Sequence, residues 1–146
     1  MATKTKSETK STCACFNLRM AARAITQAYD EALRHTGLRA TQLALLAPCR
    51  QLGSVTICEL ARTIVTDRTT LTRNVQILVR QGYLKVTKGE DGREKLVSVT
   101  AKGESALEKA YPVWCRIQNK FVSQLGKERF ERLLEDLSKA VAIIQS

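Results

Sequence analysis

The sequence predicts a mainly α-helical protein with one small two-stranded β-hairpin. Apolar residues recur every three or four positions along most of the chain, which is the spacing of one helix face. Two β-prone runs, Leu84–Lys88 and Lys95–Val99, are separated by a turn that contains Asp91-Gly92. A chain of 146 residues can bury one core. We therefore expect a single domain at 12–146, preceded by a polar, lysine-bearing flexible arm at 1–11.

The first apolar stripe runs from Leu18 to Leu33 and predicts a helix that ends near Gly37. Glycine is common just after a helix because it adopts the left-handed conformation without strain. A second helix should begin near Thr41. We expect a kink or an early break at Pro48, because proline lacks the N–H group that a helix interior needs.

The next segment predicts two helices joined by a tight turn. Thr56 and Glu59 have the spacing of a capping box, which opens a short helix with Ile64 on its buried face. Val65-Thr66 forms the turn, and Asp67 is placed to cap a helix that runs to Gly82. Its apolar residues share one side, whereas the opposite side collects Thr69, Arg73, Gln76 and Arg80. Such side chains can reach base edges and phosphates.

Two further helices are expected after the hairpin. Thr100 caps a long helix in which Pro112 should cause a kink, and Gly126 separates it from a last helix that ends near Ile144. This order predicts a winged helix-turn-helix, with the DNA-binding part at about 38–100 and dimerisation helices at about 12–37 and 101–146. Apolar stripes on the flanking helices exceed what one winged domain can cover, so we expect a homodimer.

The charge distribution points to a polyanion as partner. The formal net charge is +10, and the stretch from Arg68 to Gly89 holds five basic residues and no acidic one. A solvated surface is the alternative interpretation of such a run. The chain has no apolar run of membrane-spanning length, no visible signal peptide and an odd number of cysteines, five, so we expect a cytoplasmic protein without membrane contact. The chain has a single histidine and lacks phosphate-binding glycine motifs. We therefore expect that it is not an enzyme and that it holds no cofactor or metal.

Several motifs together resemble the MarR (multiple antibiotic resistance regulator) family over roughly residues 13–146. They are Asp67-Arg68-Thr69-Thr70-Leu71-Thr72-Arg73, Gly82-Tyr83-Leu84, the wing Asp91-Gly92-Arg93, and Val99-Thr100-Ala101-Lys102-Gly103. The resemblance implies a homodimeric transcriptional regulator whose recognition helix enters the major groove of a near-palindromic operator, while a wing arginine reaches the minor groove. The candidate DNA-binding residues are then Arg68, Thr69, Thr70, Thr72, Arg73, Gln76, Lys88 and Arg93, with Asp91 bracing the wing arginine.

Two candidate signal sites accompany this interpretation. Cys13 and Cys15 stand at a helix start, which favours the thiolate form, and Cys15-Phe16 with Tyr29 is similar to the peroxide-sensing OhrR branch. Arg19 and Ala40 replace two tyrosines of that branch, so a general oxidant or electrophile is the expected signal. The two thiols could instead pack at a dimer seam or bind metal. Trp114 with Arg19 and Arg23 could line an aromatic-acid pocket, although a core tryptophan is the commoner outcome.

The remaining three cysteines, Cys49, Cys58 and Cys115, are expected to pack in the core. Two function classes remain open. One is a DNA-binding repressor released by a small molecule or by thiol oxidation. The other is a thiol-dependent or metal-handling helical protein that uses Cys13 and Cys15. Steep salt dependence of duplex binding would distinguish the first class from the second.

Overall fold

The computed structural model describes residues 11–146, so the arm predicted at 1–11 lies outside the described residues except for Ser11. Helix α1 covers Ala14–Leu33 and continues into a single 3₁₀ turn, η1, at Arg34–Thr36. Gly37 follows with φ of +84°, in the left-handed region. The predicted end near Gly37 is therefore confirmed, with the last turn tightened from α to 3₁₀ geometry.

Helix α2 covers Ala40–Leu52 and passes through Pro48 without ending, so the predicted early break is wrong. A proline in a helix interior costs roughly 3 kcal/mol because one backbone hydrogen bond is lost. Burial of Leu45, Leu46 and Cys49 on the same helix offsets that cost. Packing of the apolar face, rather than local propensity, decides this element.

Helices α3 (Ile57–Ile64) and α4 (Arg68–Arg80) form the helix-turn-helix pair beside the wing. Strands β2 and β3 cover Leu84–Lys88 and Lys95–Val99, as predicted, and pair antiparallel with Val86 opposite Val97. The sheet nevertheless has three strands in the order β1-β3-β2, because β1 (Val55–Thr56) adds to β3. Two residues are too few to show a strand periodicity, so the expected two-stranded wing missed β1.

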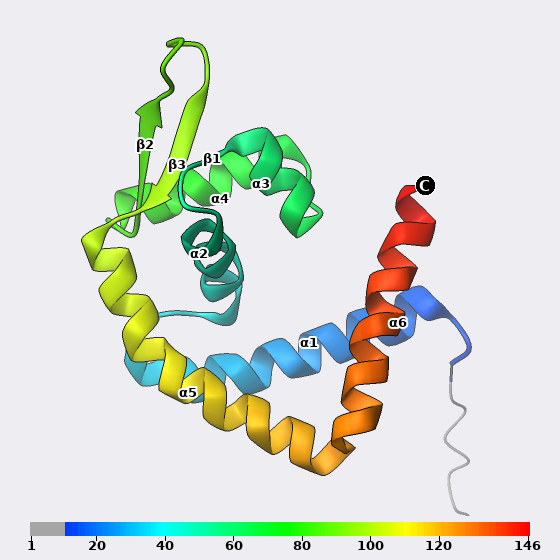
Figure 1. Ribbon diagram of the computed structural model, residues 1–146. Helices are drawn as coiled ribbons and strands as arrows, with labels where there is room; N and C mark the ends of the chain where they lie inside the picture. Colours follow the sequence, from blue (N-terminus) through cyan, green and yellow to red (C-terminus); the bar gives the residue numbers. More distant parts are fainter. Residues whose placement is uncertain (1–10) are drawn as a thin grey trace, which may run out of the picture.

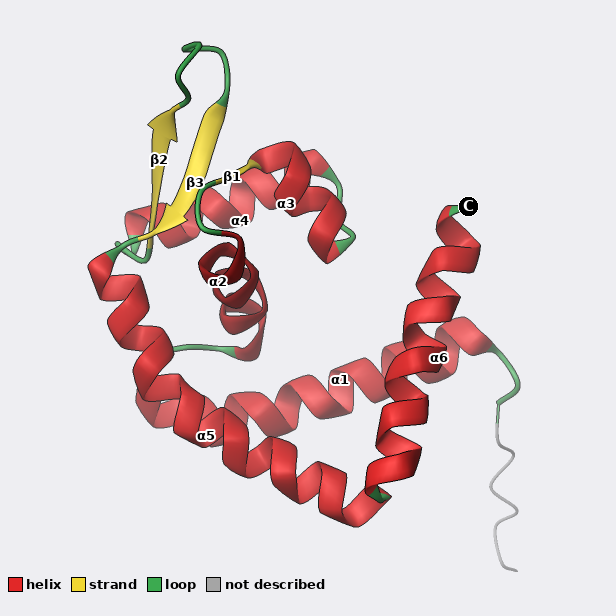
Figure 2. Ribbon diagram, viewed as in Figure 1, coloured by secondary structure: helices red, strands yellow, loops and turns green. Residues whose placement is uncertain are grey.

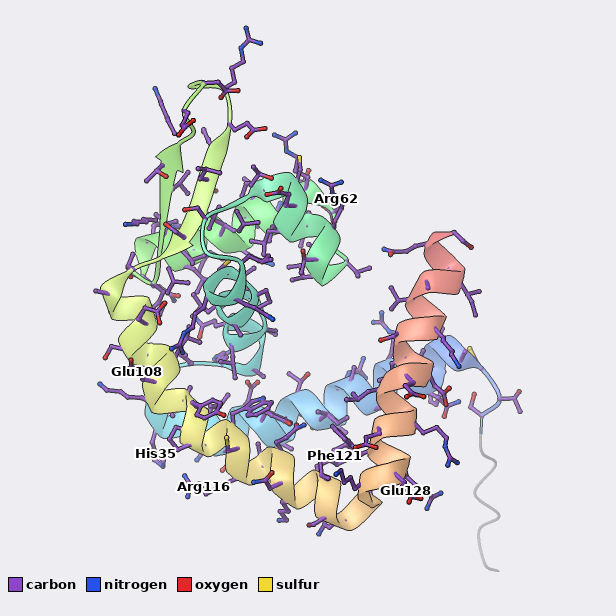
Figure 3. The ribbon with its side chains drawn as sticks, viewed as in Figure 1. His35, Arg62, Glu108, Arg116, Phe121 and Glu128 are labelled. Carbon is purple, nitrogen blue, oxygen red and sulfur yellow. The ribbon has the colours of Figure 1, made fainter. Side chains whose placement is uncertain are left out.

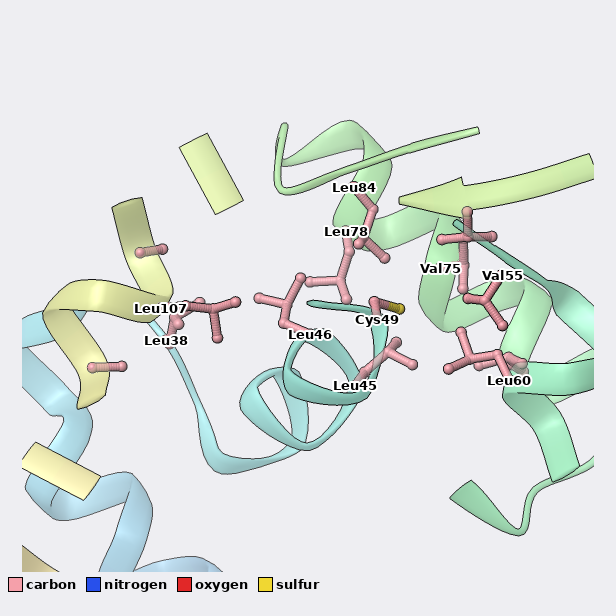
Figure 4. Close-up of a cluster of buried hydrophobic side chains, with 14 of the residues drawn as sticks. Leu38, Leu45, Leu46, Cys49, Val55, Leu60, Val75, Leu78, Leu84 and Leu107 are labelled. Carbon is pink, nitrogen blue, oxygen red and sulfur yellow. The ribbon is translucent and has the colours of Figure 1, made fainter. Parts of the chain in front are cut away.

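The core lies within the winged unit, which consists of α2, α3, α4 and the three strands, and at its junction with α1 and with helix α5 (Ala101–Leu125). Leu46, Leu60, Leu71, Leu84 and Val97 are almost completely buried. Figure 4 shows part of this cluster, in which side chains from α2, α3, α4 and the sheet meet. The buried set is Leu33, Leu38, Leu45, Leu46, Cys49, Val55, Leu60, Ala61, Leu71, Val75, Leu78, Leu84, Val97, Ala106, Leu107 and Ala110.

Two long helices complete the chain: α5 covers Ala101–Leu125 and α6 covers Lys127–Gln145. Helix α5 is continuous through Pro112, and Figure 1 shows it changing direction in its yellow part, in agreement with the predicted kink. Phe121 and Phe130 pack edge to face with ring centroids 5.9 Å apart at the corner where α5 meets α6. Figure 3 labels Phe121 at this corner.

The winged unit and the long helices occupy different parts of the molecule. Within residues 11–146 the strands lie in the winged unit, whereas α1, α5 and α6 form a helical frame at the other end (Figure 2). Helix α1 runs alongside α5, and α6 turns back from the end of α5 and crosses in front of α1 in the view of Figure 1. Helix α6 has no buried residue, and its apolar side chains Leu134, Leu137, Val141 and Ile144 are exposed.

Candidate nucleic-acid interface

The helix-turn-helix begins with the predicted capping box. The Thr56 hydroxyl accepts a hydrogen bond from the Glu59 N–H at 3.2 Å, and the Glu59 carboxylate accepts one from the Thr56 N–H at 3.0 Å. Hydrogen bonds from Thr56 lower the pKa of Glu59 from its ordinary value of 4.5. Two backbone donors that a helix start leaves without partners are thus satisfied, which fixes where α3 begins.

A tight turn connects α3 to α4. Val65 occupies the left-handed region with φ of 58° and is half exposed, which is unusual for a β-branched residue. Asp67 then caps α4, because its carboxylate accepts hydrogen bonds from the Thr70 N–H at 2.8 Å and the Thr70 hydroxyl at 2.7 Å. These bonds lower the pKa of Asp67 from 3.8. The predicted cap is confirmed.

Helix α4 has one buried side and one solvent side. Leu71, Val75 and Leu78 are buried. The side predicted to face outward is exposed at each of Thr69, Arg73, Gln76 and Arg80, and Arg68 is exposed at the helix start. A helix with this division rests on the core through one side, and its other side is free to present hydrogen-bond donors to a ligand such as a DNA groove.

Two of the candidate threonines use their hydroxyl hydrogens inside the helix. The Thr70 hydroxyl donates to Asp67, and the Thr72 hydroxyl donates to the Arg68 carbonyl at 2.8 Å. Each oxygen can still accept a bond from outside. These two residues therefore shape the start of α4. Thr69, the third candidate threonine on this helix, is exposed and makes no such bond to the described residues.

The wing loop extends from the sheet between Lys88 and Lys95, and Figure 3 shows side chains pointing into solvent at its tip. Arg93 and Lys88 are both exposed. Asp91 braces the loop through the backbone: its carboxylate accepts a hydrogen bond from the Arg93 N–H at 3.0 Å. The predicted brace thus acts on the main chain of Arg93 and leaves the guanidinium pointing to solvent.

One exposed arginine near this surface was not among the predicted residues. Arg62 lies on α3, where Figure 3 labels it, and its Nε donates to the Cys58 carbonyl at 3.4 Å. Arg62 belongs to the first helix of the pair and precedes the stretch from Arg68 to Gly89 that contains basic residues and no acidic one. Counting outward positions of α3, as for α4, would have found it.

The cysteines divide into an exposed and a buried group. Cys13 is the N-cap of α1, and its sulfur accepts a hydrogen bond from the Phe16 N–H at 3.5 Å. Cys15 is exposed in the first turn of the same helix. Cys49 is buried, and burial raises the pKa of its thiol to about 11. Cys115 is half-buried, but Cys58 is exposed, so its expected place in the core is wrong. All five are free thiols.

A hollow of about 460 Å³ lies between α2 and α5, lined by Leu43, Ala47, Arg50, Gln51, Leu107, Tyr111 and Trp114. Trp114 stacks on Tyr111 with ring centroids 6.0 Å apart. Arg19 and Arg23, the predicted partners of Trp114, are exposed on α1 and do not line this hollow. The structure of the single chain therefore does not bring Arg19 or Arg23 to this hollow. Arg50 supplies the cationic side chain instead.

Across 11–146, no three histidine, cysteine or acidic side chains gather as a metal site. No helix in that range is long and apolar enough to cross a membrane.

Comparison with known proteins matches this geometry to one family. The MarR family model matches residues 38–95. The crystal structure of the M. tuberculosis transcriptional regulator MosR in complex with DNA superposes with a TM-score of 0.80 and 41% sequence identity, over 92% of this chain and 99% of that one. The S. aureus MepR–DNA complex, 20% identical over 92% of this chain and 99% of that one, shares the fold with a TM-score of 0.78.

A curated relative agrees with these matches. The uncharacterized HTH-type transcriptional regulator YwoH of Bacillus subtilis is 28% identical over 119 residues, which are 80% of this chain and 87% of the relative. The identity to MosR extends over nearly the whole chain, including the helices that flank the winged unit. The chain belongs to the MarR family of DNA-binding transcriptional regulators.

Proposed function

We propose that the protein is a homodimeric repressor that binds a near-palindromic DNA duplex, with one α4 helix in the major groove of each half-site. The observation that carries this proposal is the outward face of α4, where Arg73, Gln76 and Thr69 are exposed opposite the buried Leu71 and Val75. Arginine can read guanine and glutamine can read adenine by paired hydrogen bonds. We assign base contacts to these side chains.

Phosphate and minor-groove contacts fall to the residues around that face. Arg68 lies at the start of α4, where backbone N–H groups also favour an anion. Thr70 and Thr72 hold the first turn of the helix and can accept from ordered water at the phosphates. Lys88 and Arg93 on the wing provide positive charge beside the groove, and a narrow minor groove attracts such an arginine.

The dimer is supported by apolar surface that a monomer leaves exposed. On α1, Phe16, Leu18, Met20 and Ile25 are each more than two-fifths exposed, and α6 carries a comparable stripe. Exposed apolar patches of this kind mark interfaces between proteins. Joining these helices across a two-fold axis would place the two α4 helices about one turn of DNA apart, roughly 34 Å. A DNA-bound regulator of this kind works in the cytoplasm, where we place it.

Release from DNA is assigned first to a small molecule in the hollow between α2 and α5. The aromatic pair Tyr111 and Trp114 with Arg50 suits a planar acid, because rings stack and the guanidinium pairs with a carboxylate. Trp114 is the single tryptophan, so its fluorescence reports on occupancy. We expect salicylate, used as a probe aromatic acid, to quench it, and Arg50→Met to weaken the quenching while Arg116→Met does not.

A thiol signal is the second candidate, favoured by the exposed Cys13 sulfur that receives a helix N–H. This contact makes Cys13 a stronger candidate than Cys15, although Cys15 carries the local similarity to the OhrR branch. Oxidation by peroxide would convert the Cys13 thiol to sulfenic acid, with release of water, and remove the cap. The test compares operator affinity of the wild type, Cys13→Ser and Cys15→Ser before and after mild peroxide. Unchanged wild-type affinity would leave the cysteines as structural residues.

The experiment that tests the proposed function is footprinting on the DNA that flanks the protein's own gene, followed by affinity measurements at several salt concentrations. We expect two protected half-sites and a linear fall of log affinity with log salt, with a slope of about 0.9 per phosphate contact. A monomer in light scattering, a single protected half-site or equal binding of all duplexes would overturn the proposal.

A further inference from the structure

The three residues that follow α4 are tied to the start of α5 through three consecutive carbonyl groups. The Gln81 carbonyl accepts a hydrogen bond from Lys102 Nζ at 2.7 Å, and the Gly82 carbonyl accepts one from the Thr100 hydroxyl. The Tyr83 carbonyl accepts one from the Thr100 N–H at 3.0 Å. We name this group, Gln81–Tyr83 with Thr100–Gly103, the α4–α5 anchor.

The anchor is packed as closely as backbones allow. Gly103 is buried, and a Cβ there would clash with the Tyr83 carbonyl oxygen and lie 2.6 Å from a Val99 methyl group. On the other side, the Tyr83 N–H donates to the Leu78 carbonyl at 2.9 Å. The end of α4, the turn and the start of α5 are therefore joined into one body.

Lys102 lies in the first turn of α5, a position where the helix dipole disfavours a positively charged side chain. Its ammonium instead reaches the carbonyl end of α4, where positive charge is favourable. It also lies 5.1 Å from the centre of the Tyr83 ring, within the range of a cation–π contact. The charge is thus matched to α4 rather than to its own helix.

Helix α5 belongs to both parts of the molecule, since it packs on α1 and leads into α6. The orientation of α4 on α5 therefore decides how far apart two recognition helices stand in a dimer. We propose that Lys102 is a positioning residue that holds α4 at one angle to α5 and so restricts the dimer to one spacing of half-sites. This inference rests on the proposed function, because it presupposes two half-sites.

The experiment measures spacing preference with Lys102→Met, which keeps the length of the side chain and removes its hydrogen-bond donor. Lys109→Met, an exposed lysine further along α5, is the matched control, and Lys102→Arg tests rescue. Affinity is measured for the operator and for versions with one base pair added or removed between the half-sites. Each such change moves a half-site by about 3.4 Å and rotates it by about 35°.

We expect the wild type, Lys102→Arg and Lys109→Met to lose at least about tenfold in affinity on the altered spacings, comparable to a mismatch. Lys102→Met should lose less than about threefold on them while binding the original operator nearly as well. An equal loss of affinity at every spacing, with a salt slope lower by about one, would identify a phosphate contact and overturn the inference. An unchanged spacing preference would overturn it too.

A second measurement needs no DNA and separates this inference from the proposed function. Amide hydrogen exchange of the Thr100 N–H in the unbound protein should be faster in Lys102→Met than in Lys109→Met. Equal exchange in the two variants would show that Lys102 does not hold the anchor. A wild type that binds no duplex specifically, together with faster exchange of the Thr100 N–H in Lys102→Met, would contradict the proposed function but not the role of Lys102 in the anchor.

Discussion

The single residues of the candidate interface divide into those that stabilise helix α4 and those that face solvent. The side chains of Asp67, Thr70 and Thr72 form hydrogen bonds within the first turn of α4. The carboxylate of Asp91 accepts its hydrogen bond within the wing loop. Arg73 makes no such bond among the described residues and is exposed. The sequence predicted which side of α4 faces outward, and that side is exposed. It could not show which hydroxyl groups the helix itself would use.

Arg73 and Arg93 should differ in what their removal does to binding. Arg73→Ala is expected to cost about 1–3 kcal/mol on the preferred operator and to relax preference at one base pair, because a paired contact to guanine is lost. Arg93→Ala should weaken binding to all duplexes similarly and reduce the salt slope. Affinities for a set of singly substituted operators measure both effects, with Arg116→Ala on α5 as control. Equal loss of base preference in both variants would contradict the assignment.

Asp67 should make the stability of the protein depend on acid pH. Its folded-state pKa lies below the ordinary 3.8, so its contribution is present above that value and is lost as the pH falls through the lower folded pKa. Asp67→Asn keeps a capping oxygen that does not titrate, so Tm should fall less steeply below about pH 4. Asp136→Asn, in α6, is the control. Equally steep falls in all three proteins would show that this cap does not contribute.

At the scale of elements, sequence reasoning succeeded where local chemistry determines the structure. The capping box at Thr56 and the cap at Asp67 set both helix starts, and the Asp91-Gly92 turn set the hairpin. It failed where distant parts of the chain decide. Strand β1 exists because Val55 pairs with Val97, some forty positions later in the chain, and α2 continues past Pro48 because its apolar face is buried.

The same distinction explains the pocket. Trp114 could be proposed from its residue type, but its cationic neighbour depends on how α2 lies across α5. That packing brings Arg50, rather than Arg19 or Arg23, to the tryptophan. Arg50 Nε also lies 3.0 Å from Glu104 in the first turn of α5. No spacing along the sequence links these residues.

Gly103 should be the least tolerant position at the junction of α4 and α5. Replacing a helical glycine by alanine ordinarily stabilises a helix by roughly 1 kcal/mol. Here the added methyl group meets the Tyr83 backbone and cannot be relieved by a side-chain rotation, so Gly103→Ala is expected to lower the unfolding free energy by about 1–3 kcal/mol. Urea unfolding measures this change. Ser105→Ala, at an exposed position of α5, should be nearly neutral, and a stabilised Gly103→Ala protein would contradict the close packing.

At the scale of the whole molecule, helix α5 is shared by the winged unit and by the helical frame that contains α6. The winged unit has its own core, whereas α6 has no buried residue and a long apolar stripe. Helix α5 connects them through its buried first half and its corner with α6. The winged unit can therefore stay folded when the contact between protomers is lost. The two α4 helices, however, then no longer have a fixed spacing.

Dissociating the dimer should consequently reduce DNA binding without unfolding the winged unit. Leu137→Glu places a charge in the apolar stripe of α6, and burying that charge in an interface is costly unless it is paired. Ala142→Glu makes the same addition of charge at an exposed position off the stripe, so it serves as the matched control. Light scattering should give half the mass for Leu137→Glu at micromolar concentration, and the wild-type mass for Ala142→Glu.

The DNA result follows from losing one of two linked contacts. A dimer binds its second half-site as an intramolecular event, which raises affinity by about 10²–10⁴ over one half-site. Leu137→Glu should therefore bind the full operator no more tightly than an isolated half-site, and its salt slope should fall to about half. Its circular dichroism should retain the helix and strand content of the wild type, since no buried residue is changed. Monomeric protein that still protects both half-sites with wild-type affinity would show that α6 does not join the protomers.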